Sequence, residues 1–204
     1  GITTTGATVI ENLETKSYGI LIWRALLQWL GGVGIIVMAL AVLPMLSIGG
    51  MQLFKTESYE TPDKVVPKAA SFAAGISIVY ITLTIIWAFM LWGAGMSIFD
   101  SIAHSMTTLA TGGYSTKSES LAAFNSSTIE IIIICGMLVG SLPFVHYLTL
   151  TKNGIKNLMK DDQVRLFLTL VFFVVLIMSL YLNSNNIPYF EALRLASFNV
   201  ISII

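Results

Sequence analysis

Long uncharged stretches alternate with short polar segments along the chain. No Asp, Glu, Lys or Arg occurs in four stretches, at residues 25–54, 69–99, 131–151 and 166–190. Each stretch supplies the roughly 20 apolar residues that a helix needs to cross about 30 Å of hydrocarbon. Within these stretches we predict membrane-spanning helices at about 23–46, 71–92, 129–150 and 166–182. The pattern therefore predicts an all-α integral membrane protein.

One further segment is too short and too polar to be a fifth span. Residues 97–116 read SIFDSIAHSMTTLATGGYST, so a lipid-facing helix here would expose several hydroxyl groups and His104. Only about 24 Å of helix fits between Asp100 and Lys117, and two glycines would interrupt it. Non-helical backbone at membrane depth is tolerated only where protein buries it or water lines it. We therefore predict a short re-entrant helix and loop that enter and leave on the same side.

Lys and Arg are distributed unevenly between the two sides that this topology creates. The connectors at 51–68 and 152–165 hold seven of the eleven, and the opposite side holds four. Because short cytoplasmic loops are enriched in Lys and Arg, both connectors are expected in the cytoplasm. Only 11% of the residues are charged and the net charge is zero, so nucleic acid is not expected as a partner.

A threonine-glycine sequence recurs before two of the predicted spans, on the outer side each time. Residues 4–8 read TTGAT before the first span, and residues 110–114 read ATGGY before the third. A third copy of the unit begins at residues 190–200, after the fourth span. The repeating unit is therefore a span, a short re-entrant helix, a threonine-glycine loop and a second span.

Such a unit has the chemistry to bind a dehydrated cation. A helix that ends in mid-membrane directs the negative end of its dipole at the loop that follows. Extended Thr-x-Gly backbone can turn its carbonyl oxygens inward and replace the water shell of a potassium ion. Glycine permits the positive φ angles that this arrangement requires. The repeat therefore predicts a pore for a weakly hydrated monovalent cation.

Five sequences carry a family resemblance: GITTTGATV at 1–9, WLGGVGII at 29–36, PMLSIGGMQLF at 44–54, AHSMTTLATGGYST at 103–116 and SFNVISII at 197–204. In combination they resemble the membrane subunit of Trk-type potassium uptake systems, within the Trk/Ktr/HKT superfamily. The resemblance implies a potassium-channel-like fold, in which four units of helix, pore helix, filter loop and helix surround one pore.

The resemblance also divides the chain into parts of that architecture. Residues 1–50 would be the filter and following helix of the second repeat, and residues 71–151 the complete third repeat. Residues 166–204 would be the helix and pore helix of the fourth repeat, ending before its filter. Residues 51–70 and 152–165 would be cytoplasmic connectors. We therefore expect a partial chain, which lacks the first repeat and the fourth filter and cannot close the pore alone.

A site and its partners follow from the same resemblance. The ion-binding filter would consist of Thr4, Thr5, Gly6, Ala110, Thr111 and Gly112. Its key glycines would be Gly6 and Gly112. The implied function is potassium uptake by a multi-pass protein of the bacterial inner membrane, with the potassium ion as substrate and no cofactor. The implied partners are the lipid bilayer, a second copy in a homodimer and a cytoplasmic nucleotide-binding regulatory subunit.

The third predicted span carries an interruption. Gly136, Gly140, Ser141 and Pro143 occur there, and proline removes a helical hydrogen bond. The interruption is either a packing kink or an intramembrane gate loop below the filter. The resemblance favours the gate.

Two other classes of function stay open from the residues alone. Broken helices and glycines also mark alternating-access carriers of small solutes, and a non-transporting membrane scaffold is the third class. Repeated pore helices on one side favour the pore, and a scaffold has no need of threonine-glycine backbone in lipid. The sequence shows no nucleophile triad, phosphate loop or metal-ligand cluster, so an enzyme is not expected.

Overall fold

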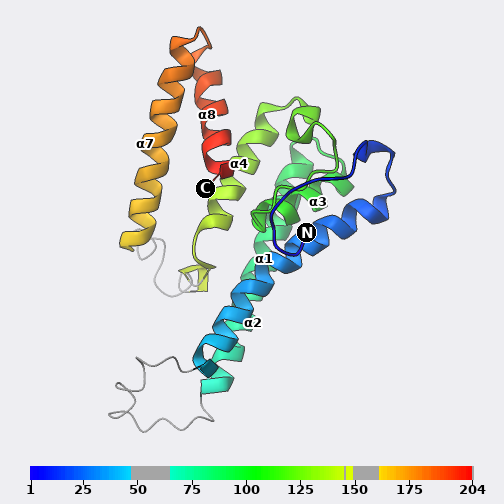
Figure 1. Cartoon of the computed structure of the whole chain (residues 1–204), viewed down its shortest axis with the longest axis vertical. Coiled ribbons are helices and arrows are strands. Elements are labelled where there is room, and N and C mark those ends of the chain that lie inside the picture. Colours follow the sequence, from blue (N-terminus) through cyan, green and yellow to red (C-terminus); the bar gives the residue numbers. More distant parts are fainter. Residues whose placement is uncertain (47–64, 145, 149–160, 204) are drawn as a thin grey trace.

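The computed structural model describes residues 1–46, 65–144, 146–148 and 161–203, and its regular elements are all helices (Figure 1). Three of them are long and apolar enough to cross a membrane: α1 (Tyr18–Leu46), α2 (Val65–Gly93) and α7 (Asp162–Ser184). The shorter helices are α3 (Ile98–Leu109), α4 (Ser127–Ser141) and α8 (Tyr189–Ile203). Two 3-10 turns, η1 (Leu13–Thr15) and η4 (Ser120–Phe124), complete the elements. The all-α membrane fold is thereby confirmed.

The third predicted span is interrupted in the structure. A span with a break in it was expected over about 129–150, and α4 ends at Ser141, after which Leu142 has an extended backbone with ψ 147°. Pro143 follows at once and cannot donate the backbone hydrogen bond that would continue the helix. The break therefore lies within the predicted segment, at its Leu142–Pro143 end.

Several helices begin at a capped residue. The Ser97 hydroxyl accepts a hydrogen bond from the Asp100 amide over 3.1 Å at the start of α3. The Asp161 carboxylate accepts one from the Gln163 amide over 2.8 Å at the start of α7. Ser126 caps α4 in the same way. These polar caps supply partners to the free N–H groups of each first turn and fix where each helix begins.

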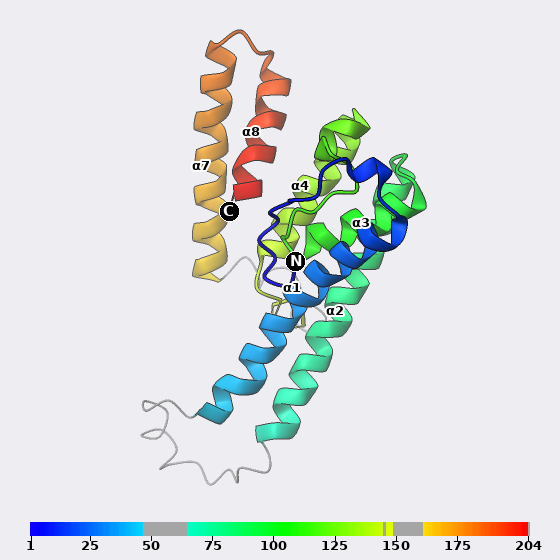
Figure 2. The same ribbon diagram turned by 45° about the vertical axis from the view of Figure 1, so that its right-hand side comes forward.

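Helices that are adjacent in the chain also pack together in space. Figures 1 and 2 show α1 and α2 side by side, with α3 inserted against their upper halves and α4 beside α3. The α7–α8 hairpin joins this group through the contact of α8 with α4. A buried cluster holds the centre together, made of Ile76, Tyr80, Trp87, Leu109 and Phe144.

The outer surface of the long helices is apolar. Only 11% of the span in α7 is buried. Its exposed large apolar side chains include Leu166, Leu170, Phe172, Phe173, Ile177 and Leu180. Side chains of this kind are stable at a surface that lipid tails cover, so α7 presents a lipid-facing surface.

The loops on the expected outer side gather at one end of the molecule. The Glu14 carboxylate accepts hydrogen bonds from the amide and hydroxyl of Ser118, over 2.7 and 2.6 Å. At the same end, Arg194 at the start of α8 pairs with Glu130 at the start of α4 over 3.0 Å. The segment before α1, the loop after α3 and the start of α8 therefore share one side, as the topology requires. Most of the two expected cytoplasmic connectors lies outside the described residues.

Candidate functional site

The chain turns back on itself immediately after α3. The Thr116 hydroxyl donates a hydrogen bond to the Asp100 carboxylate over 2.6 Å. The Ser115 hydroxyl oxygen lies 3.0 Å from Nε2 of His104. Residues after the loop thus return to the level of the first turns of the helix. A helix of 12 residues is only about 18 Å long, too short to cross the hydrocarbon. The re-entrant topology predicted for this segment is therefore what the structure shows.

The polar side chains of α3 face protein rather than lipid. Ser101, His104, Ser105 and Thr107 are all buried. The serine and threonine hydroxyls donate to carbonyl oxygens of the preceding turn, and Nδ1 of His104 lies 2.8 Å from the Asp100 carbonyl. These hydrogen bonds supply partners for the hydroxyl and imidazole groups, which would have none in a helix exposed to lipid.

The C-terminal end of α3 has an unusual backbone at Thr111. The Thr111 amide donates to the carbonyl of Thr108 over 3.0 Å, and the Gly112 amide donates to that of Thr107 over 2.9 Å. This is the Schellman pattern, in which glycine normally occupies the left-handed position. Thr111 occupies it here, with φ 50°. A β-branched residue in this region is strained by about 1–3 kcal/mol, and such strain concentrates at functional sites.

The N-terminal loop repeats this backbone. Thr4 has φ 52°, and its amide donates to the carbonyl of Gly1 over 2.9 Å, as Thr111 does to Thr108. Two residues later, Gly6 has φ 76° and Gly113 has φ 78°. The geometry therefore matches Thr4 to Thr111 and Gly6 to Gly113. The register of the two loops is shifted by one residue from the sequence expectation, which paired Gly6 with Gly112.

The two loops lie against each other. A Cβ atom on Gly6 would collide with the carbonyl oxygen of Gly112. The Tyr114 hydroxyl donates to the carbonyl of Ala7 over 3.2 Å, just beyond this contact. The structure therefore brings together the two groups of residues that the sequence assigned to one filter.

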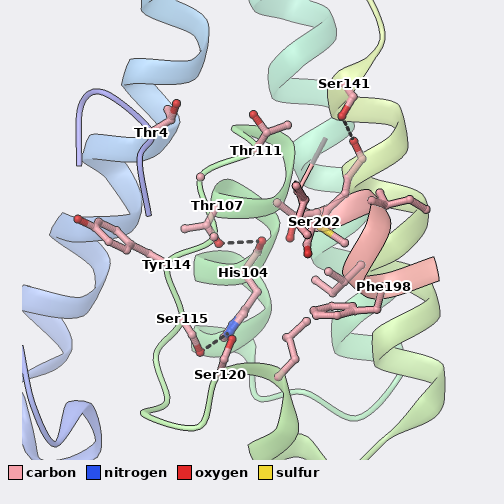
Figure 3. Close-up of a pocket in the computed structure, with 18 of the residues that line it drawn as sticks. Thr4, His104, Thr107, Thr111, Tyr114, Ser115, Ser120, Ser141, Phe198 and Ser202 are labelled. Atoms are coloured by element: carbon pink, nitrogen blue, oxygen red, sulfur yellow. Dashed lines mark hydrogen bonds between the residues drawn. The ribbon is translucent and has the colours of Figure 1, made fainter. Parts of the chain in front are cut away.

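A pocket of about 420 Å³ opens beside both loops. Figure 3 shows Thr4 and Thr111 along one end of it, with Ser141 of α4 and Ser202 of α8 across from them. Thr5, Gly112 and Gly113 also line it, whereas Ala110 is buried behind the loop. The C-terminal end of α3 leads directly into the second loop at the pocket and carries about half a negative charge, and Phe198, Ile201 and Ser202 of α8 also line the pocket.

The oxygens around this pocket are neutral. Its lining includes threonine and serine hydroxyls and loop backbone, but no Asp or Glu. In the part of the chain that the structure describes, no group of three or more His, Cys, Asp or Glu residues could hold a metal ion. Neutral carbonyl and hydroxyl oxygens, aided by helix dipoles, suit a weakly hydrated monovalent cation better than a divalent one.

The residues expected in the gate have different surroundings. Gly140 lies under the end of α3, where an added Cβ would be 3.0 Å from the carbonyl oxygen of Leu109. Ser141 lines the pocket. Gly136 instead packs against Trp87, away from that lining. Pro143 follows the break in α4. Only Gly140 and Ser141 are therefore adjacent to the loops.

Sequence analysis missed the role of α1 in holding the loops. The Gln28 side chain donates to the carbonyl of Gly112 over 2.7 Å and accepts from the amide of Tyr114 over 3.1 Å. One turn later, an added Cβ on Gly31 would collide with the carbonyl oxygen of Ile2. A polar glutamine inside an apolar span was the available signal, because such residues in membrane helices are commonly functional.

Comparison with known proteins agrees with this arrangement. Residues 1–202 match the family model TrkH, described as a cation transport protein. The chain is 38% identical to the Trk system potassium uptake protein TrkI of Halomonas elongata over 205 residues. It is 39% identical to the Trk system potassium uptake protein TrkH of Escherichia coli K12 over 209 residues. Each alignment covers 100% of this chain, which spans 42% and 43% of the length of these two relatives.

A solved structure is similar over nearly the whole chain. The crystal structure of the potassium transporter TrkH from Vibrio parahaemolyticus matches with a TM-score of 0.84 at 36% sequence identity. The match covers 99% of this chain and 41% of that structure. The similarity therefore extends over the short helix α3 and its loop as well as the long helices.

Proposed function

Because the chain belongs to the TrkH family of cation transport proteins, we propose that it forms part of a pore for potassium uptake across a bacterial membrane. Potassium is the ion named for each of the three relatives described above. The proposed activity is that of a whole transporter, in which further repeats would complete the ring around the pocket. The family is one of transport proteins, so an enzymatic reaction is not part of the proposal.

One observation carries the proposal. Two loops far apart in the sequence have the same strained backbone, with left-handed Thr4 and Thr111 followed by left-handed Gly6 and Gly113. Both loops line the same pocket. Backbone strain of this kind needs a compensating role, and orienting carbonyl oxygens toward a shared ion supplies one.

The proposed potassium ligands are backbone carbonyls and threonine hydroxyls of both loops: Thr4, Thr5, Gly6, Ala110, Thr111 and Gly112, with Gly113 added from the backbone geometry. Ala110 is 4% exposed, so only its carbonyl oxygen, not its side chain, is proposed to contribute. The C-terminal end of α3 at the pocket would attract the cation without binding it so tightly that it could not leave.

A gate is proposed below this filter. Gly140 and Ser141 lie next to the filter end of α3, and the helix breaks at Leu142 and Pro143 immediately afterwards. The Tyr147 hydroxyl donates to the carbonyl of Val139 over 2.8 Å, beside the 3.4 Å bond from the Leu142 amide to the same carbonyl. Pro143 cannot supply the amide that a continued helix would direct at this carbonyl. Gly136 belongs to the same segment, but its contact with Trp87 gives it a packing role.

The partners remain part of the proposal. The resemblance implies a homodimer and a cytoplasmic nucleotide-binding regulatory subunit, which would dock on the basic inner loops. The lipid-facing surface of α7 supports the bilayer as the surrounding medium.

Ion flux into liposomes tests this function. A full-length protein that carries this chain would be reconstituted with defined K⁺ or Na⁺ gradients, and uptake of each ion would be measured. We expect K⁺ flux that exceeds Na⁺ flux and does not require counter-transport. An alternating-access carrier, which the broken α4 would also fit, would instead show flux stimulated by solute on the opposite side. Equal K⁺ and Na⁺ flux, or none, would contradict the proposal.

A further inference from the structure

The Gln28 side chain makes two hydrogen bonds to one filter loop. Gln28 is fully buried, and its amide nitrogen lies 2.7 Å from the Gly112 carbonyl oxygen. Its amide oxygen accepts from the Tyr114 backbone amide over 3.1 Å. One side chain thus pairs with a backbone acceptor and a backbone donor two residues apart, as a neighbouring β-strand would. This pairing fixes the direction of the Gly112 carbonyl.

The contact with Gln28 explains why residue 112 is glycine. Gly112 is not among the glycines with positive φ. An added Cβ would instead collide with the amide carbon of Gln28, and it would lie 2.8 Å from the amide nitrogen. Gly6 and Gly113 need glycine for their backbone conformation, whereas Gly112 needs it to admit this side chain. The sequence expectation that positive φ explains both key glycines therefore holds for Gly6 alone.

Arg24 extends the same contact by one helical turn. Its guanidinium carbon lies 4.3 Å from the centre of the Tyr114 ring, and one of its nitrogens donates to the Thr8 hydroxyl over 2.9 Å. Tyr114 in turn donates to the carbonyl of Ala7. One face of α1, a helix that follows the first loop, therefore holds the outer end of the second loop and links the two.

We propose that Gln28 is a positioning residue of the filter, which sets the carbonyl directions of residues 111–113 and thereby the preference for potassium over sodium. The inference rests on the proposed function and adds a residue outside the loops to it. Without Gln28, the buried Gly112 carbonyl would lose its donor and could rotate. Rotation would change the spacing of the neighbouring carbonyls around the ion, which selectivity depends on.

Ion preference in matched variants tests this role. Gln28→Leu and the similarly long Gln28→Met each remove both hydrogen bonds without adding a charge. The control is Thr84→Val, which breaks the 3.0 Å hydrogen bond from Trp29, one residue further along α1, without contacting either loop. We expect both Gln28 variants to lower the K⁺/Na⁺ flux ratio about tenfold, equivalent to about 1.4 kcal/mol. Thr84→Val should keep the original ratio.

The outcomes separate this inference from the proposed function. If the unmodified protein shows no K⁺ flux or no preference, the proposed function fails. If it shows both and the folded Gln28 variants keep its ratio, the positioning role is wrong. A purely structural role would lower the amount of folded protein and the total flux without moving the ratio.

A double-mutant cycle keeps the test decisive if Gln28→Leu folds poorly. Gly112→Ala should displace the Gln28 amide, and Gln28→Ala should make room for the added methyl group. We expect the K⁺/Na⁺ flux ratio of the double variant to be no lower than that of the more impaired single variant. Independent, multiplicative losses would show that the two residues do not act together and would overturn the proposal.

Discussion

Gly6 lies directly against the carbonyl oxygen of Gly112, although α1, α2 and α3 all separate the two residues in the sequence. This contact joins two loops with the same left-handed Thr and Gly positions. A pocket with neutral oxygens adjoins this contact, at the C-terminal end of α3. Both loops are therefore expected to act on the same ion.

Replacement of Gly6 by serine should weaken ion selectivity. Gly6 has φ 76°, which costs a residue with a Cβ roughly 1–2 kcal/mol, and the new atom would also collide with Gly112. We expect the K⁺/Na⁺ flux ratio of the full-length protein to fall about tenfold. Gly19→Ala is the control, because no atom lies within 4 Å of its added Cβ. An unchanged ratio in a folded Gly6→Ser variant would remove Gly6 from the filter.

The glycines of α1 should differ sharply in their tolerance of alanine. A Cβ on Gly31 would collide with the backbone of Ile2 at the start of the first loop, whereas Gly34 has no neighbour within 4 Å. Gly31→Ala should lower the free energy of unfolding by about 1–3 kcal/mol through overpacking. Gly34→Ala should leave it unchanged or raise it by up to about 1 kcal/mol. Unfolding in detergent measures both, and equal effects would contradict the contact.

Removal of the break in α4 should alter the amount of flux without altering selectivity. Pro143→Ala restores a backbone donor just beyond Ser141 and favours continuation of the helix. We expect a changed K⁺ flux and an unchanged K⁺/Na⁺ ratio, because Pro143 is not among the described residues that line the pocket. If Pro143→Ala transports as the unmodified protein does, the break is a packing kink.

The contact between the N-terminal segment and the loop after α3 should weaken in acid. Hydrogen bonds from the Ser118 hydroxyl and amide lower the pKa of Glu14 from 4.5 to about 2. Because the folded pKa is depressed, the stability from this contact is fully present above pH 4.5 and is lost as the pH falls toward 2. Thermal unfolding between pH 6 and 3 should show this loss, and Glu14→Gln should reduce it. If Glu14→Gln loses as much stability in acid as the unmodified protein, other titratable groups cause the loss.

Much of the fold was predictable because membrane insertion imposes simple rules. Uncharged stretches located α1, α2 and α7, and the polarity of residues 97–116 predicted the re-entrant turn. The TrkH family and the all-α membrane fold are confirmed by the family match and the similar crystal structure. The composition of residues 136–143 predicted a break in the third span, and α4 ends there, immediately before Leu142 and Pro143.

The details of the site were less predictable because they depend on contacts between distant residues. The sequences TTG at 4–6 and ATGG at 110–113 can be aligned with Gly6 opposite either Gly112 or Gly113, and the backbone angles match Gly6 to Gly113. The reason for glycine at position 112 lies in Gln28 on α1, and the sequence pattern did not predict that α1 packs against this loop. The division of the chain into repeats and the ion-binding roles stay predictions.

The location of the bound ion tests the central claim most directly. A structure of the full-length protein in Rb⁺ or Tl⁺, heavy substitutes for K⁺, would reveal the ion by its anomalous scattering. We predict a peak within coordination distance of carbonyl oxygens from both loops, at residues 4–6 and 110–113. A peak that contacts only one loop, or an ion bound elsewhere with this pocket empty, would contradict the account.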